Sequence, residues 1–332
     1  MSKLLTDASL YEIIKKAKDR AENKVVEPMD AYVYLYDGNT LHFSNKPITD
    51  HGGHVLTEEY FIEKDGTFTG WGETPWSDNR RVIEKITSEE EYIPPVSMAY
   101  MFYQCQKLTD ISGLANWDTR AVTSMQNTFY ECKQLSDISA LANWNTGSVV
   151  GMRSLFYGCS KLSDISALSN WDTGSAYNMS AMFESCSQLS EINALSRWNI
   201  ESVTSLNNMF KACSQLSDIS ALSDWKTGAV TNMSGMFEQC SKLSDISALA
   251  SWNTESVYDI SYLFSYCVEL SSVDALSDWK TGEVYTMSGT FNYCVNVPTF
   301  EPLNNWNVKN VTNHLNTFST TYGTRPTWGV NW

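Results

Sequence analysis

The sequence predicts an α/β solenoid, and two columns of residues carry that prediction. The eight cysteines are spaced 27 residues apart, and eight of the twelve tryptophans keep the same interval. A fixed period in this range is typical of a solenoid, in which each repeat is one supersecondary unit stacked on the next. Eight such repeats fill residues 98–313. The two columns are Cys105, Cys132, Cys159, Cys186, Cys213, Cys240, Cys267 and Cys294, and Trp117, Trp144, Trp171, Trp198, Trp225, Trp252, Trp279 and Trp306.

Each repeat is predicted to hold one short helix and one short strand. In the sixth repeat, Val230, Met233, Phe237 and Cys240 recur at spacings of three, four and three, which indicates the apolar stripe of a helix. The following segment, Leu243–Ser247, is predicted to be a strand. Stacked repeats would join these strands into a parallel sheet and leave the helices on the opposite face.

The repeated motif Met-Phe-x-x-Cys-x-x-Leu-x-x-Ile, with a tryptophan further along, resembles the BspA-type leucine-rich repeats of bacterial surface proteins. Residues 101–111 carry one copy of the motif and residues 236–246 another. The resemblance covers residues 98–313 and a leading cap from Trp71. It implies a leucine-rich-repeat-like, right-handed superhelix, a role in adhesion, host interaction or a phage particle, and no catalytic residues.

Both flanks of the repeats depart from the 27-residue pattern and are predicted to be separate parts. Residues 1–70 are predicted to form a small α+β attachment unit, with a helix at Ser9–Asn23 and a hairpin that joins Tyr32–Tyr36 to Leu41–Phe43. A second hairpin is predicted to join Glu59–Glu63 to Thr67–Thr69. Residues 71–97 and 314–332 are predicted to be the caps that shield the two ends of the core.

Composition argues against several classes of partner and location. A formal charge of -15 argues against nucleic acid, because phosphates favour a basic surface. No stretch approaches the roughly 20 apolar residues of a membrane-spanning helix. The first residues also lack a basic-then-apolar signal sequence, so a virion-associated or cytoplasmic location is expected over classical secretion.

The even number of cysteines allows a disulfide scaffold, but their positions favour a column of free, buried thiols. Neighbouring helices of a solenoid would hold these cysteines about 10 Å apart, beyond disulfide reach. No second Cys or His stands at ligand spacing in any repeat, so no metal and no cofactor are expected. His51-Gly-Gly-His54 is interpreted as a solvated loop in preference to a metal site. Asp172-Thr-Gly is interpreted as a turn, because no second such triplet completes an aspartic-protease site.

Two surface columns are candidate binding sites. The acidic column follows the leucine of each repeat by two residues, and it is either a solvated face or a site for cations or basic partner groups: Asp110, Asp137, Asp164, Glu191, Asp218 and Asp245. The aromatic column stands two residues before the cysteine: Tyr103, Tyr130 and Tyr157. Two further tyrosines, Tyr266 and Tyr293, directly precede their cysteines. Exposed tyrosines are common interface anchors, although such rings also pack between adjacent coils.

These observations favour a non-enzymatic recognition or adhesion protein that presents a rigid repeat surface to a protein or glycan partner. In this interpretation the protein is a surface-exposed subunit of a larger particle such as a phage virion, held in its assembly through residues 1–70. An intracellular protein–protein interaction scaffold is the alternative, because it would also keep the thiols reduced. An enzyme carried by the N-terminal unit is the third hypothesis.

Overall fold

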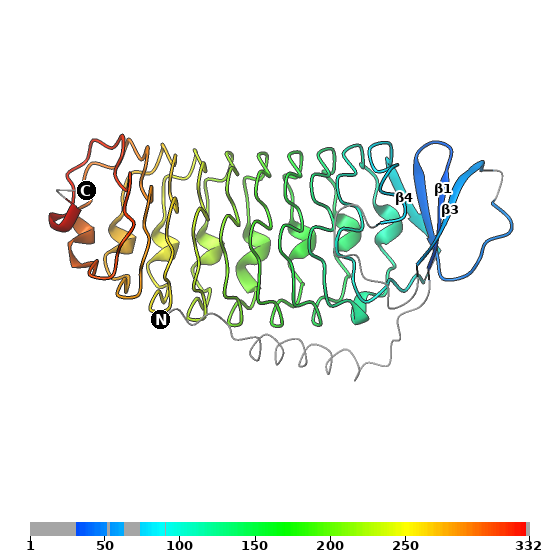
Figure 1. Cartoon of the computed structure of the whole chain (residues 1–332), viewed down its shortest axis with the longest axis horizontal. Coiled ribbons are helices and arrows are strands. Elements are labelled where there is room, and N and C mark those ends of the chain that lie inside the picture. The colour runs from blue at the N-terminus through cyan, green and yellow to red at the C-terminus, as the bar shows by residue number, and fades with distance from the viewer. Residues whose placement is uncertain (1–30, 52–53, 63–73, 90, 330–332) are drawn as a thin grey trace. The chain divides into compact units, whose positions relative to one another are not determined.

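The structure, a computed structural model, describes residues 31–51, 54–62, 74–89 and 91–329. The predicted helix at Ser9–Asn23, most of the second predicted hairpin, and Trp71 lie outside these residues. The chain divides into two compact units, and the boundary between them falls between Ala176 and Tyr177. Within each unit, successive coils repeat the same path (Figure 1).

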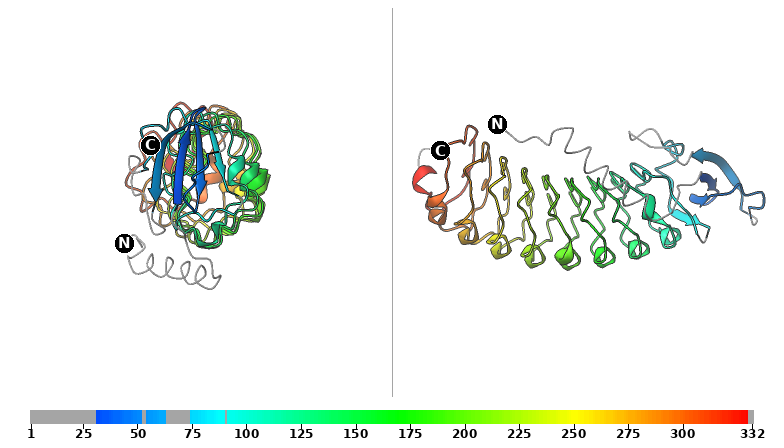
Figure 2. Two further views of the ribbon diagram at one scale, coloured as in Figure 1. Left: turned by 90° about the vertical axis from the view of Figure 1, so that its right-hand side faces the viewer. Right: turned by 90° about the horizontal axis from the view of Figure 1, so that it is seen from below.

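The first unit begins with a four-stranded sheet in the order β3-β1-β2-β4 (Figure 2). β1 and β2 form the first predicted hairpin, which turns through Gly38 and Asn39 with left-handed φ angles of 78° and 62°. β3 pairs antiparallel with β1, and β4 pairs in parallel with β2. β4 therefore brings part of the predicted cap segment into the same sheet as residues 31–62. The strands are β1 (Ala31–Tyr36), β2 (Thr40–Ser44), β3 (Leu56–Ile62) and β4 (Lys85–Ser88).

An aromatic cluster around Phe43 closes the core of the first unit beneath this sheet. The Phe43 ring centroid lies 5.6 Å from those of Trp76 and Tyr92 and 5.1 Å from that of Trp117. β4 joins the sheet to the first coil, because the amide of Ile86 donates to the carbonyl of Asp110 at 2.8 Å. The sheet thus covers the end of the core with its own apolar face.

The helix predicted from Val230, Met233, Phe237 and Cys240 is wrong, because this stretch is a run of turns. Its amides alternate between two acceptors: Phe237 donates to Leu263 in the next coil, whereas Cys240 donates back to Phe237. The residues five and one before the cysteine, Gly235 and Gln239, have left-handed φ angles of 62°. Such angles break a right-handed helix. A run of turns also directs every third or fourth side chain inward, so the apolar stripe could not distinguish it from a helix.

The strand predicted at Leu243–Ser247 is also absent. Ile246 has φ -119° and ψ 21°, and a short 3-10 helix begins at the next residue. Neighbouring coils are bridged at another position, eight residues before the cysteine, as between Asn232 and Asp259. The predicted parallel sheet of repeat strands and the predicted face of α-helices are therefore corrected: the coils in the described residues consist of turns and 3-10 helices.

Apart from η2, the 3-10 helices recur at equivalent places and lie along one side of each unit (Figure 2). Those of the first unit are η1 (Ser112–Leu114), η2 (Thr119–Ala121), η3 (Ser139–Leu141) and η4 (Ser166–Leu168). Those of the second unit are η5 (Asn193–Arg197), η6 (Ser220–Leu222), η7 (Ser247–Leu249), η8 (Asp274–Leu276), η9 (Glu301–Asn305) and η10 (Thr327–Gly329).

The cysteine, phenylalanine and tryptophan columns form the interior of the coils. All eight cysteines are buried and free. Cys240 Sγ donates to the carbonyl of Phe210 at 3.1 Å, and the rings of Phe210 and Phe237 stack at 5.9 Å. Because backbone hydrogen bonds join the coils along the whole turn run, their separation is that of β-strands, about 5 Å. The expected separation of about 10 Å between cysteines, which assumed packed helices, was therefore wrong.

Aromatic stacking continues to the C-terminal end of the second unit. Phe318 stacks on Phe291 at 5.8 Å, and Trp328 stacks on Trp306 at 6.1 Å. The indole Nε1 of Trp328 donates to the carbonyl of Leu303 at 2.8 Å, as the preceding tryptophans do in their coils. These side chains cover the last coil of the described residues. No helix in the described part of the chain is long and apolar enough to span a membrane.

Candidate recognition surfaces

The run of turns places four positions of every coil outside the core columns, where the long side chains are exposed or half-buried and several of the small residues, such as Ser265 and Gly289, are buried. These positions stand six, five, two and one residues before the cysteine, or before Thr321 in the last coil, and we call them the turn ridge. The alternating Met, Phe and Cys side chains of the same run fill the core, so the ridge positions can vary without disturbing it. Equivalent ridge residues of successive coils lie next to each other, because amides of one coil donate to carbonyls of the next.

The structure brings the three predicted tyrosines of the first unit into one stack. The ring centroids of Tyr103 and Tyr130 are 4.6 Å apart, and those of Tyr130 and Tyr157 are 4.3 Å apart with nearly parallel planes. The three side chains are half-buried, and both faces of the central Tyr130 ring are covered by its neighbours, which leaves its edge for a partner. Burial, with the neighbouring tyrosines, raises the pKa of Tyr130, so its hydroxyl stays protonated at neutral pH.

In the second unit the same ridge position carries charge instead of rings. Lys211 Nζ lies 2.9 Å from Glu238 Oε2. Burial raises the pKa of Glu184, and the positive charge of Lys211 opposes that rise. The column that is aromatic in the first unit is therefore an ion-paired row here.

A second aromatic stack lies on the ridge near the end of the second unit. Tyr266 and Tyr293 stack at 4.4 Å between ring centroids, with an angle of 8° between their planes. Tyr262, four residues before Tyr266 and also on the ridge, is 44% exposed. The sequence interpretation did not include Tyr262, although its position five residues before Cys267 was a sufficient signal.

The acidic column lies away from the ridge, directly before the 3-10 helices. Oδ1 of Asp137 accepts the amide of Ser139 at 2.8 Å, and Oδ1 of Asp218 accepts that of Ser220 at 2.8 Å. These hydrogen bonds lower the pKa of both aspartates. Asp110, Asp164 and Asp245 make the same turn, which initiates the helix that follows. The carboxylates thus have a local structural role, and the second oxygen of most of them faces solvent.

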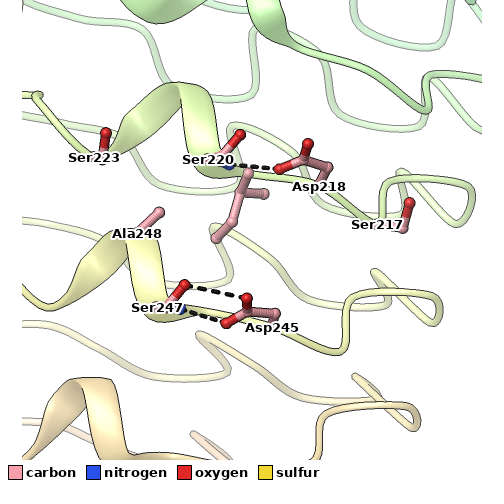
Figure 3. A pocket seen from close by; sticks show the side chains of 8 residues that line it. Ser217, Asp218, Ser220, Ser223, Asp245, Ser247 and Ala248 are labelled. Carbon is pink, nitrogen blue, oxygen red and sulfur yellow. Dashed lines mark hydrogen bonds between the residues drawn. The ribbon is translucent and has the colours of Figure 1, made fainter.

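A shallow hollow of about 400 Å³ lies between two of these aspartates in the second unit. Figure 3 shows Asp218 and Asp245 turned toward Ser220 and Ser247 of their own coils. Both carboxylate oxygens of Asp245 are engaged by Ser247. The described residues contain no group of three or more His, Cys, Asp or Glu side chains that could hold a metal ion.

The two loop histidines lie against a tyrosine of the first unit. His51 Nδ1 is 3.2 Å from Tyr36 Oη, and the ring of His54 lies 5.3 Å from that of Tyr36. His42 of β2 lies on the same face, with Nδ1 2.9 Å from Thr87 Oγ1, and burial lowers its pKa. These contacts pack the loop against the sheet.

Comparison with known proteins identifies one family. The family model described as "Mycoplasma protein of unknown function, DUF285" matches residues 96–219, 163–269 and 204–327, which together are more than half of the chain. No curated protein matches the sequence. The crystal structure of a leucine-rich repeat protein from Eubacterium ventriosum is similar at 13% identity, with 92% of this chain and 96% of that chain covered and a TM-score of 0.29. Likeness at that level carries no argument about fold or function.

Proposed function

This chain belongs to the DUF285 family, and from that premise we propose that it is a non-enzymatic recognition protein that adheres to a protein or glycan partner through its turn ridge. The observation that supports the proposal is the stack of Tyr103, Tyr130 and Tyr157 on the outside of successive coils. Tyrosines fixed by stacking offer ring edges and hydroxyl groups at a low cost in side-chain entropy, which suits them to recognition.

The coil framework supports this role because it separates folding from recognition. The inward columns repeat nearly unchanged, whereas the ridge changes from tyrosines to ion pairs and back to tyrosines. A partner can therefore be selected by a row of side chains with no change to the core. In this proposal the carboxylates of the acidic column stabilise the turns, and their solvent-facing oxygens also contact basic groups of the partner.

Residues 1–70 attach the protein to a larger particle in this proposal, and an intracellular scaffold remains the alternative. The buried thiols do not favour the scaffold, although the sequence interpretation used them for it. Burial raises the pKa of Cys105 to about 12, and the thiolate is the reactive form. Thiols protected in this way stay reduced in either compartment.

Binding of the full chain to arrays of purified cell-surface proteins and of glycans tests the proposal. We expect saturable binding that falls about tenfold or more in Tyr130→Ser or Tyr266→Ser. The control Tyr285→Ser, at an exposed tyrosine that lies off the ridge, should leave binding unchanged. No binding to either array would contradict the recognition function, and turnover by the full chain in a hydrolase panel would favour the enzyme hypothesis.

A further inference from the structure

Exposed apolar side chains gather in the last coils of the second unit. Six of the nine large apolar side chains that are exposed in the described residues lie between residues 262 and 322. Scattered exposed apolar residues are ordinary, but a gathered set marks an interaction surface. Four of the six, Tyr262, Tyr266, Tyr293 and Leu315, are on the turn ridge.

The ridge of these coils carries no charged residue, although the chain has a formal charge of -15. In the preceding coils of the same unit the ridge holds Glu184, Lys211 and Glu238. Oδ1 of the nearby carboxylate of Asp259 accepts the amide of Ser261 at 2.9 Å and so serves the fold. The uncharged ridge positions are Ser261, Tyr262, Ser265, Tyr266, Ser288, Gly289, Asn292, Tyr293, Leu315, Asn316, Ser319 and Thr320.

The rings on this ridge are held in fixed positions. Tyr262 lies against Gly289, where an added Cβ would come within 2.6 Å of the tyrosine ring. Gly289 also has a left-handed φ of 64°, which glycine adopts without strain, and the Tyr262 ring leaves no room for a side chain. One face of the Tyr293 ring stacks on Tyr266. The equivalent residue of the next coil is Thr320, so no stacked ring covers the other face of Tyr293. Groups ordered in advance lose little entropy when a ligand binds.

We propose that this part of the ridge binds a neutral, linear glycan. The proposal rests on the proposed function and narrows its partner. Sugar rings present C–H faces to aromatic rings and hydroxyl groups to polar side chains, and this ridge exposes the tyrosines together with Asn316 and Thr320. The coils repeat about every 5 Å along the ridge, a step comparable to one pyranose unit. A protein surface or an anionic glycan would bring charges that this ridge cannot pair.

Two binding experiments on the full chain test this inference. One is a titration with N-acetylchitohexaose, a neutral linear oligosaccharide, and the other is an array of neutral and anionic glycans. We expect binding to neutral glycans that is the same at low and high salt, because no charges pair in the complex. The double variant Tyr266→Ser/Tyr293→Ser should lose about tenfold or more in affinity. Tyr285→Ser is the matched control, because Tyr285 is 58% exposed in the same coil as Tyr293 but lies off the ridge.

A second measurement needs no variant. Nitration of exposed tyrosines, located by mass spectrometry, should fall at Tyr266 and Tyr293 when the bound glycan is present and stay constant at Tyr285. Failure to bind any neutral glycan, or equal protection of all three tyrosines, would overturn the inference. If the full chain then still binds a deglycosylated protein on the protein array, the recognition function stands without the glycan. If the full chain binds neither the glycan array nor the protein array, both the glycan inference and the proposed recognition function are contradicted.

Discussion

Replacing Trp225 by alanine should remove one layer of the second unit's core. The side chain is 3% exposed, its ring stacks on that of Trp252 at 6.3 Å, and its Nε1 donates to the carbonyl of Leu195 at 3.0 Å. Truncating a buried tryptophan costs about 3–5 kcal/mol, and leaving the Leu195 carbonyl without its donor adds about 1 kcal/mol. We therefore expect Trp225→Ala to destabilise its coil and the neighbouring coils by about 4–6 kcal/mol.

Amide hydrogen exchange measured by mass spectrometry would locate this loss, because local opening of a repeat protein is not captured by one global transition. Peptides from the coils around Trp225 should exchange about a thousandfold faster or more, since each 1.4 kcal/mol is a factor of ten. Trp225→Phe, which keeps an aromatic ring and loses only the donor and part of the area, should cost about 1–3 kcal/mol. A phenylalanine variant as unstable as the alanine variant, or an alanine variant that loses less than about 1 kcal/mol, would refute the reasoning.

Four further predictions concern the buried thiols, two aspartates and one glycine. A thiol reagent at mildly alkaline pH should modify none of the eight cysteines in the folded protein and all of them in denaturant, because all eight are buried and burial disfavours the reactive thiolate. Asp218→Asn should change the free energy of unfolding by less than about 0.5 kcal/mol, since the asparagine oxygen still accepts the hydrogen bond of the Ser220 amide. Asp218→Ala loses this hydrogen bond and should cost about 1 kcal/mol. Chemical denaturation measures both differences. Gly289→Ala should lower the free energy of unfolding by about 1–2 kcal/mol or more, because φ at this residue is 64°. The control Gly228→Ala should change the free energy of unfolding little, because the added Cβ would lie 3.5 Å from its nearest atom. The pKa of Asp137 is lowered in the folded protein. The stabilisation that this carboxylate provides is therefore present above its unfolded pKa of about 3.9 and is lost as the pH falls through the folded pKa. Thermal melts at decreasing pH should show this loss of stability, and Asp137→Asn should make the loss smaller.

The repeated architecture could be predicted because its cause is visible in the sequence. A side chain buried between two equivalent coils must meet its own counterpart, so Cys, Phe and Trp recur at a strict interval. Position within the repeat also explains which of the candidate tyrosines stack. Tyr130 meets Tyr103 and Tyr157 because residues at equal positions of adjacent coils become neighbours.

The local backbone could not be predicted because it is determined by the next coil. Left-handed φ angles occur at Gly235 and Gly289, but also at Ser154, Tyr266 and Thr320, where the residue type gives no such signal. The amides of Gly235, Tyr266 and Gly289 donate to carbonyls of the following coil, and for Tyr266 this bond holds a conformation that the residue's own propensity disfavours. The structural role of the acidic column could not be predicted either. Each aspartate accepts a hydrogen bond from a Ser amide that is available only in the turned conformation.

The distribution of charge follows from this division between an inward and an outward set of positions. Inward columns are restricted to residues that stack on themselves, so nearly all variation in charge falls on the outside of the coils. In the second unit the ridge passes from an ion pair between Lys211 and Glu238 to an uncharged run that holds Tyr266 and Tyr293. The core tolerates both rows equally, so packing does not explain the change. The proposed recognition function accounts for it: the charged coils suit a partner with charges to pair, and the uncharged coils suit a partner with none.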